Sequence, residues 1–246
     1  MIKFINKPGH VPIHDFGFNI MLLHGFINQT EASIRDSITK YEVEGPETFV
    51  IEDYPEDDIY ISIDSYMGID DQSVNLDDIF KRYYPSIMRR SALLTIIGLL
   101  EHEIEKFCIS YSKRHTTNIN LNDLKGMGFE RGHRFIKKVV GLRNSKSFPK
   151  ITKIIKLRNS CAHNDARLVS NDNQEIPEIV RLLDQHPDIL ERDGNQVLFN
   201  EGALVTFLNV FEDYIKEIEA HISPPRQAPK LFHSGDKVAA AVGNTP

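Results

Sequence analysis

The residues best suited to chemistry lie in the segment 156–165, which reads KLRNSCAHND. Arg158 offers a permanent positive charge with several N–H donors, and His163 offers an imidazole, the side chain that exchanges protons most readily near neutral pH. Together they could stabilise the negative charge on a phosphate and move a proton during phosphodiester cleavage. The alternative is structural, with Arg158 forming an ion pair in the core and His163 capping the end of a helix.

This segment falls at the end of a predicted amphipathic helix over residues 149–163. Its apolar positions form one arc around the helix axis, and Arg158 falls in the middle of that arc. A charge there must be paired or must face a cavity or partner surface, because burial of an unpaired charge is prohibitive. Asn159 and His163 share a face beside the arc. Glu101, at the edge of the apolar side of a second predicted helix, is the acid expected to pair with Arg158, unless it is an ordinary surface carboxylate.

Most of the remaining chain is predicted to be helical. Apolar residues recur at helical spacing from Asp15, a candidate N-cap, to about residue 42, and again over 76–114, where a long helix begins after Asn75 and is interrupted near Pro85. Other helices are predicted over 129–142, 149–163, 177–185 and 202–221. The β-prone runs 48–51 and 59–63 predict a short hairpin, and residues 193–195 predict a tight turn.

The net charge of −6 hides two segments of opposite charge. Residues 41–79 contain thirteen acids and no Lys or Arg, a local charge of −13, whereas residues 111–169 contain fourteen Lys and Arg against three acids, a local charge of +11. A phosphate backbone would be attracted to the second segment. Its candidate RNA-binding residues are Arg134, Lys137, Lys138, Arg143, Lys153 and Lys156. Alternatively, the acidic segment folds over the basic one, or both are solvated surfaces.

The sequence lacks the usual features of a membrane or secreted protein. The longest nearly continuous apolar run, over residues 92–100, is too short to span a bilayer, and the N-terminus lacks the order of basic, apolar and small residues found in a signal peptide. Cys108 and Cys161 form neither a metal-ligand pair nor a disulfide framework. We therefore expect a cytoplasmic protein without a membrane partner.

Arg158, Asn159 and His163 resemble the signature of the HEPN superfamily, in which an Arg, usually followed by a polar residue, precedes a His by a gap of four to six residues. The adjoining Leu157 and Asn164 look typical of its ribonuclease members. The resemblance covers roughly residues 75–221 and leaves the first seventy or so residues outside it.

The resemblance implies an all-α fold that dimerises so that two copies of the motif face one cleft. It also implies RNA cleavage without a metal or other cofactor, in which His163 acts in proton transfer at the 2′-hydroxyl and Arg158 steadies the phosphate charge. The product would carry a 2′,3′-cyclic phosphate. Asn159 would orient the imidazole or bind phosphate, and Glu101 and Asn164 would support the site.

The predicted architecture is therefore mainly α, a HEPN-like antiparallel helical bundle with an N-terminal helical extension and a small acidic β-hairpin. We expect an acidic N-terminal region over residues 1–74, the helical domain over 75–222 and a flexible tail over 223–246, where Pro, Ala, Gly and Lys predominate.

The implied function is that of an endoribonuclease of the kind used by bacterial toxins and in abortive-infection defence against phage. Its expected partners are RNA, a second copy of the chain, and an antitoxin protein or RNA. The alternative is a non-catalytic HEPN-like module that binds RNA or a regulatory protein partner. In either case the acidic segment is hypothesised to cover the basic face until a partner displaces it, or else to bind a partner unrelated to RNA.

Overall fold

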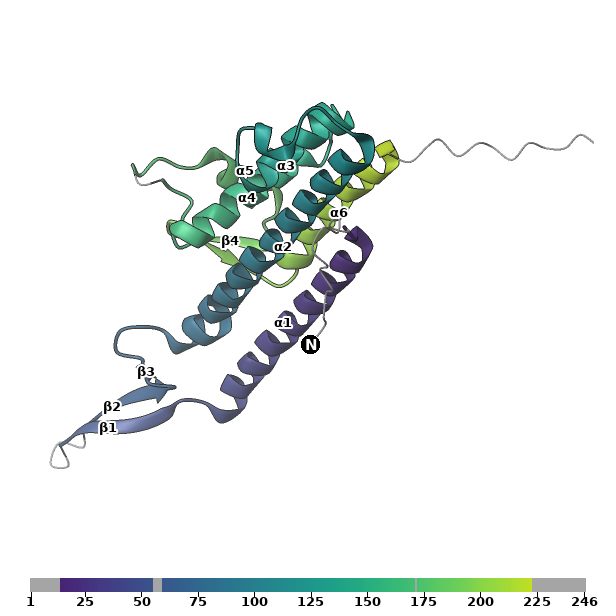
Figure 1. Cartoon of the computed structure of the whole chain (residues 1–246). Helices are drawn as coiled ribbons and strands as arrows, with labels where there is room; N and C mark the ends of the chain where they lie inside the picture. Colours follow the sequence, from purple (N-terminus) through teal and green to yellow (C-terminus); the bar gives the residue numbers. More distant parts are fainter. Residues whose placement is uncertain (1–13, 55–58, 171, 223–246) are drawn as a thin grey trace, which may run out of the picture.

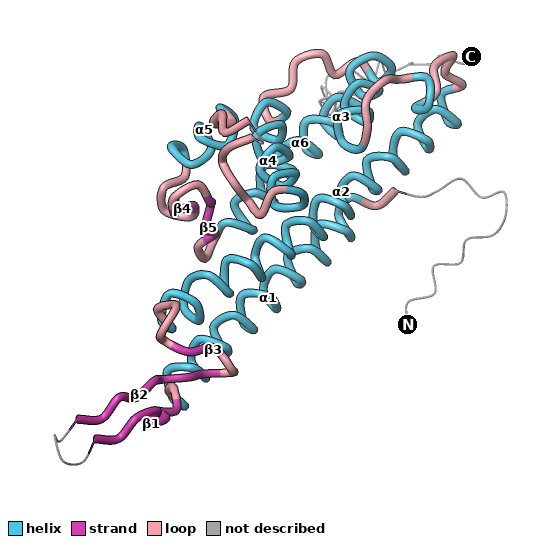
Figure 2. Tube along the Cα trace, turned by 90° about the vertical axis from the view of Figure 1, so that its left-hand side faces the viewer, coloured by secondary structure: helices cyan, strands magenta, loops and turns pink. Residues whose placement is uncertain are grey.

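The computed structural model describes residues 14–54, 59–170 and 172–222. Within these ranges the chain is mainly helical, as predicted, with two small antiparallel sheets (Figures 1 and 2). The α-helices are α1 (Phe16–Glu44), α2 (Tyr84–His115), α3 (Gly128–Phe135), α4 (Phe148–His163), α5 (Pro177–Gln185) and α6 (Ala203–Ile222). The strands are β1 (Glu47–Tyr54), β2 (Ile59–Tyr66), β3 (Ile69–Asp70), β4 (Leu190–Asp193) and β5 (Gln196–Phe199).

The long helices α1 and α2 run side by side in opposite directions and form the axis of the molecule (Figures 1 and 2). α1 begins at the predicted cap, because the Asp15 carboxylate accepts a hydrogen bond from the Phe18 amide at 2.9 Å. Its buried apolar residues recur at helical spacing and pack against α2 and α6.

The predicted interruption before the second long helix is confirmed. The Asn75 side chain accepts a hydrogen bond from the Asp78 amide at 3.1 Å, and a π-helical turn, Asp78–Tyr83, precedes α2. Pro85 stands in the first turn of α2, directly after the π-helical turn, and has no N–H to donate to the preceding turn. The chain thus changes helical geometry just where proline cannot donate a hydrogen bond.

The helix α4 packs between α2, α5 and α6, with Ile151, Ile154 and Leu157 almost fully buried. Its N-terminal end is held from α6, because the Glu217 carboxylate accepts hydrogen bonds from the amides of Lys146 and Ser147 at 3.1 and 3.0 Å. These amides would otherwise lack helical partners. A side chain far along the sequence therefore caps the helix that carries Arg158 and His163.

Both β-hairpins are antiparallel. The first pairs β1 with β2, as predicted, and β3 adds a short third strand. The second, β4–β5, encloses the predicted turn at residues 193–195, but its strands were not expected. Leu190, Val197, Leu198 and Phe199 bury the hairpin against the helices. Two strands of four residues are too short for an alternation pattern to be recognised without those packing partners.

The apolar core crosses the boundary predicted at residue 74. Phe16, Leu23 and Ile27 of α1 belong to the same buried cluster as the apolar residues of α2, α4 and α6. A second, small cluster joins Tyr41 to Tyr66 of β2, together with Leu76 and Phe80. The change of charge along the sequence therefore does not mark separate cores.

The predicted flexible tail, 223–246, lies outside the described residues. None of the helices within the described ranges combines the length and apolar character needed to cross a membrane.

Candidate functional site

The motif residues occupy the C-terminal half of α4. Leu157 and Ser160 face the core, Arg158 is half-buried, and Asn159 and His163 are exposed. Lys156 is exposed as well, and its spacing from Asn159 and His163 places the three on one side of the helix. α4 thus presents an amide, an imidazole and an ammonium group to solvent, with a guanidinium beside them.

Arg158 has the acidic partner predicted for it. Its Nη2 lies 3.8 Å from Glu101 Oε2 on α2, and its Nη1 donates to Asn159 Oδ1 at 3.1 Å. Among the described residues, its buried Nε finds no hydrogen-bond acceptor. The guanidinium is therefore hydrogen-bonded to Asn159 and attracted to Glu101, and it keeps N–H groups that could donate to a bound oxyanion.

Glu101 is itself fixed by the start of α3. Its Oε1 accepts from the Phe129 amide at 3.3 Å, where unpaired N–H groups favour a carboxylate. The preceding Gly128 has φ +50°, and a Cβ atom there would lie 2.6 Å from Glu101 Oε1. The sequence alone does not single out Gly128, because the short Gly126-Met127-Gly128 run does not fit a nucleotide-binding loop. Its role becomes visible only once α2 and α3 are placed together.

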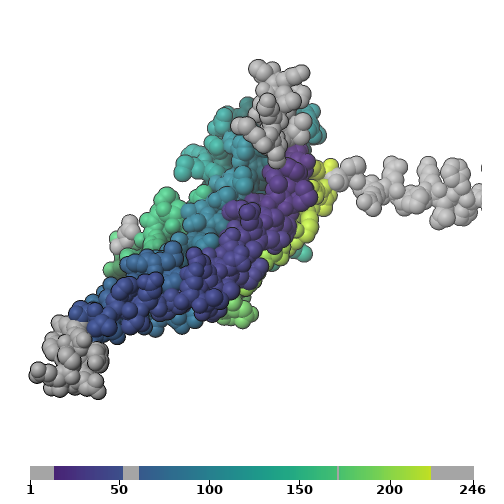
Figure 3. Space-filling view, turned by 90° about the horizontal axis from the view of Figure 1, so that it is seen from below, coloured from purple at the N-terminus to yellow at the C-terminus, as the bar shows by residue number. Residues whose placement is uncertain are grey.

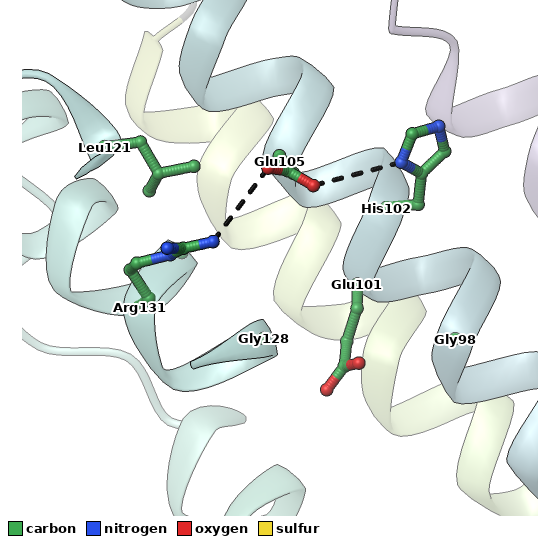
Figure 4. A pocket seen from close by; sticks show the side chains of 8 residues that line it. Gly98, Glu101, His102, Glu105, Leu121, Gly128 and Arg131 are labelled. Carbon is green, nitrogen blue, oxygen red and sulfur yellow. Dashed lines mark ion pairs between the residues drawn. The ribbon is translucent and has the colours of Figure 1, made fainter. Parts of the chain in front are cut away.

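A pocket of about 220 Å³ lies between α2 and α3 beside Glu101 (Figure 4). Arg131 points across it toward Glu105, with Nη2 3.9 Å from Oε1, and His102 Nδ1 lies 3.9 Å from the other Glu105 oxygen. Both separations are longer than a hydrogen bond, so these groups remain available to a ligand or to water. None of the three was singled out from the sequence as a candidate site residue.

The loop that follows the motif is clamped from two other elements. Asp165 and Ala166 both have positive φ, +49° and +57°, which is unfavourable for residues other than glycine. The buried Arg90 of α2 donates through Nη1 to the carbonyl and carboxylate oxygens of Asp165 at 3.1 and 3.0 Å, and Gln196 of β5 donates to the same two groups. These contacts offset the strain and fix the end of α4.

Asn164, the predicted supporting residue, belongs to this clamp. Its Nδ2 donates to the Val169 carbonyl at 2.8 Å, so its amide holds the loop. The side chain of His163, the last residue of α4, forms no hydrogen bond or ion pair with any other described residue. Five positions on a helix separate His163 from Arg158 by about 140° around the axis. Within one chain, therefore, Arg158, Asn159 and Glu101 lie together, whereas His163 lies on another side of α4.

The predicted RNA-binding residues do not all share this surface. Only Lys156 lies beside the motif with its side chain exposed, whereas Lys153 donates to Gln185 Oε1 at 2.9 Å. Arg134 forms an ion pair with Glu130 within α3. Exposed side chains also occur in the π-helical turn after α3 and in the following loop, at Lys137, Lys138 and Arg143.

No protein-family model, curated protein or solved structure matches this chain. Its function is therefore inferred from the residues and contacts described above.

Proposed function

We propose that this chain is a metal-independent endoribonuclease of the HEPN type, with Arg158, Asn159 and His163 as the groups that act on RNA. The observation that supports this proposal most strongly is the state of Arg158. Asn159 accepts a hydrogen bond from its guanidinium and Glu101 lies 3.8 Å away, yet among the described residues the group keeps N–H donors without an acceptor. An ion pair formed only to satisfy a core charge would require neither the exposed Asn159 nor the exposed His163.

In the proposed reaction, His163 takes the proton from the ribose 2′-hydroxyl as the 2′-oxygen attacks the neighbouring phosphorus. The bond from phosphorus to the 5′-oxygen breaks, which leaves a 2′,3′-cyclic phosphate on one fragment. The departing oxygen takes a proton from water and becomes the 5′-hydroxyl of the other fragment. Arg158 holds the non-bridging phosphate oxygens through charge-assisted hydrogen bonds, and Asn159 keeps the guanidinium in place.

A homodimer would complete the proposed site. Within one chain Arg158 and His163 point to different sides of α4, so the groups needed at one phosphate come together most simply from two copies. The surface beside Asn159 also carries apolar side chains that the rest of the chain leaves partly open, because Ile155 is half-buried and Ala162 is exposed. Two α4 helices facing one another would cover these residues and bring the motifs into one cleft.

The biological role proposed is that of a cytoplasmic toxin or abortive-infection effector, held in check by an antitoxin protein or RNA. A non-catalytic module that binds RNA or a protein remains the second candidate. It is favoured by the lack of any described contact that orients His163.

Cleavage of total cellular RNA in EDTA would test the proposal. We expect wild-type protein to cut and to leave 2′,3′-cyclic phosphates, and His163→Ala to lose about 100-fold or more of the rate, as general-base removal typically does. His115→Ala, which removes another exposed histidine at the end of α2, is the matched control and should cut normally. Equal cutting by His163→Ala, or RNA binding without cutting by the wild type, would favour the binding module instead.

A further inference from the structure

The hairpin formed by β1 and β2, called the arm below, projects from one end of the molecule, beyond the ends of α1 and α2 (Figures 1 and 3). The described acids near it pair locally, as Asp77 does with Lys81 and Asp78 with Arg82. Among the described residues, no ion pair joins the acidic segment 41–79 to the basic segment 111–169. The hypothesis that the acidic segment covers the basic face of its own chain is therefore not supported.

The base of the arm is held firmly. The rings of Tyr41, Tyr66 and Phe80 lie with their centroids 4.9 to 5.0 Å apart, in one stacked and two edge-on pairs. The Tyr66 hydroxyl donates to Glu44 at 2.8 Å, and the Tyr41 hydroxyl donates to Asp77 at 2.9 Å. The arm is thus presented in a defined direction by the two long helices.

Beyond this base, the arm exposes apolar side chains that the described residues do not cover. Phe49 pairs directly with Ile63, and Ile61 lies on the same side of the sheet two residues away. Phe49 and Ile61 are 49% and 45% exposed, and Ile51, next to the bulge, is 48% exposed. On the opposite side Val50 is 61% exposed. Proteins usually avoid such a surface on a small sheet, because it favours association.

The arm also has a free edge. The strand order β1-β2-β3 places β1 at the edge of the sheet, so its outer N–H and C=O groups have no strand partner among the described residues. Unpaired strand edges are recurrent sites for the addition of an extended peptide from another protein. The sequence from Glu47 to Asp71 contains nine acids and no Lys or Arg.

We propose that the arm is a docking surface for a basic, extended segment of a partner protein, which adds a strand to the free edge of β1. Its apolar side chains would cover Phe49, Ile51 and Ile61, and its Lys or Arg residues would meet the surrounding acids. This inference does not depend on the ribonuclease proposal.

The negative charge of the arm favours a basic partner segment over the alternative occupants. Nucleic acid and the arm of a second copy are both repelled by nine acids. The basic segment of a second copy has the right charge, but its described residues 111–169 form helices and loops and offer no strand.

A fluorescent eight-residue peptide of alternating Lys and Val is a suitable probe, followed by its anisotropy on titration with the full-length protein. We expect saturable binding that weakens at least tenfold when Phe49→Ser and Ile61→Ser are combined. Met67→Ser, which changes a 79% exposed residue outside β1 and β2, is the control and should bind as wild type does. A twin peptide with alternate backbone amides N-methylated should fail to bind, because it cannot complete the strand pairing.

Three results would overturn the inference. The first is absence of binding at millimolar peptide, and the second is binding that neither the paired serine substitutions nor N-methylation weakens, since that would be charge attraction alone. The third is self-association of the protein without peptide, measured by sedimentation, that the Phe49→Ser and Ile61→Ser pair abolishes. In that case a second copy of the chain occupies the arm.

Discussion

Arg158 is a charged residue at a position of α4 that helical periodicity assigns to the apolar side. A guanidinium in the middle of an apolar arc must find an acid, and the sequence predicted Glu101 as that acid. The contact is present at 3.8 Å. The contact is longer than a hydrogen bond, and the two side chains are 25% and 23% exposed, so a phosphate could displace Glu101 in the proposed reaction.

Arg158→Lys tests whether the planar fork matters or only the charge. Lysine keeps the charge but cannot hold Asn159 and a phosphate in the same plane. We expect RNA cleavage to fall about 100- to 1,000-fold, as for loss of an oxyanion-stabilising donor. Arg167→Lys, an exposed arginine in the same basic segment, should leave the rate unchanged. Full activity of Arg158→Lys would show that Arg158 serves only as a core ion pair.

His133 makes stability depend on pH. Its ring is buried against Phe148, with centroids 3.3 Å apart, and its Nδ1 contacts the Tyr214 hydroxyl at 2.8 Å. Burial lowers the His133 pKa from 6.5 to about 4, with a further contribution from Lys137. Between these values the unfolded chain binds more protons, so the free energy of unfolding falls by about 3 kcal/mol as pH drops from 6.5 to 4.

Urea unfolding at pH 7, 5.5 and 4 measures this effect. His133→Phe removes the titrating group, so its unfolding free energy should change less over that range than that of the wild type. The comparison concerns the pH dependence, because loss of the Tyr214 contact will also lower stability at pH 7. Identical pH dependence in both proteins would contradict the assignment to His133.

The helices and the first hairpin could be predicted because periodicity and capping act locally. Asp15 and Asn75 cap the helices where expected, and Pro85 marks the interruption. The strands β4 and β5 could not be predicted, since their four residues each are defined by burial against the helices.

The motif of the candidate site could likewise be found from spacing and residue type. Its supports could not, because the Arg90 clamp on Asp165 and the fit of Gly128 against Glu101 join residues far apart in the sequence. Such contacts depend on backbone conformation and on helix approach, which no local pattern encodes.

The approach of α3 to α2 depends on Gly132. A Cβ atom at this position would lie 2.5 Å from Ile104 Cγ2, a buried, branched side chain. We expect Gly132→Ala to lower the free energy of unfolding by about 1–3 kcal/mol through overpacking.

Gly98→Ala is the matched control on α2, because a Cβ there meets no atom within 4 Å. It should stabilise the protein by up to about 1 kcal/mol through helix propensity. Thermal unfolding distinguishes the two, and a neutral Gly132→Ala would mean that α3 moves freely.

At the scale of the whole molecule, a buried ion pair links α1 to α2 and β5 beside the apolar core that they share. Arg89 of α2 donates to both Glu31 carboxylate oxygens of α1, at distances from 2.7 to 3.1 Å, and to the Phe199 carbonyl of β5 at 3.1 Å. The two side chains are only 7% and 10% exposed. Nothing in the sequence distinguishes Glu31 from an ordinary surface acid. In the fold, it helps to attach α1 to α2.

Glu31→Ala should therefore lower the free energy of unfolding by about 3–5 kcal/mol, because it leaves the Arg89 guanidinium buried without its carboxylate. Combining Glu31→Leu with Arg89→Met replaces the pair by apolar groups and should restore most of that loss. Urea unfolding of the three proteins gives the comparison. A mild effect of Glu31→Ala would indicate that water reaches Arg89 and that α1 is more loosely attached than its contacts suggest.

The carboxylate that caps α4 has a consequence for synthesis of the protein. Glu217 stands 54 residues after His163, so the ribosome produces the entire Arg158–His163 motif before the group that caps its helix. At ordinary translation rates of about 5–20 residues per second, that interval lasts about 3–11 s. During this time the nascent chain carries the motif side chains without the cap on their helix, and the proposed RNA-cleaving centre would be completed only after most of the polypeptide has been made.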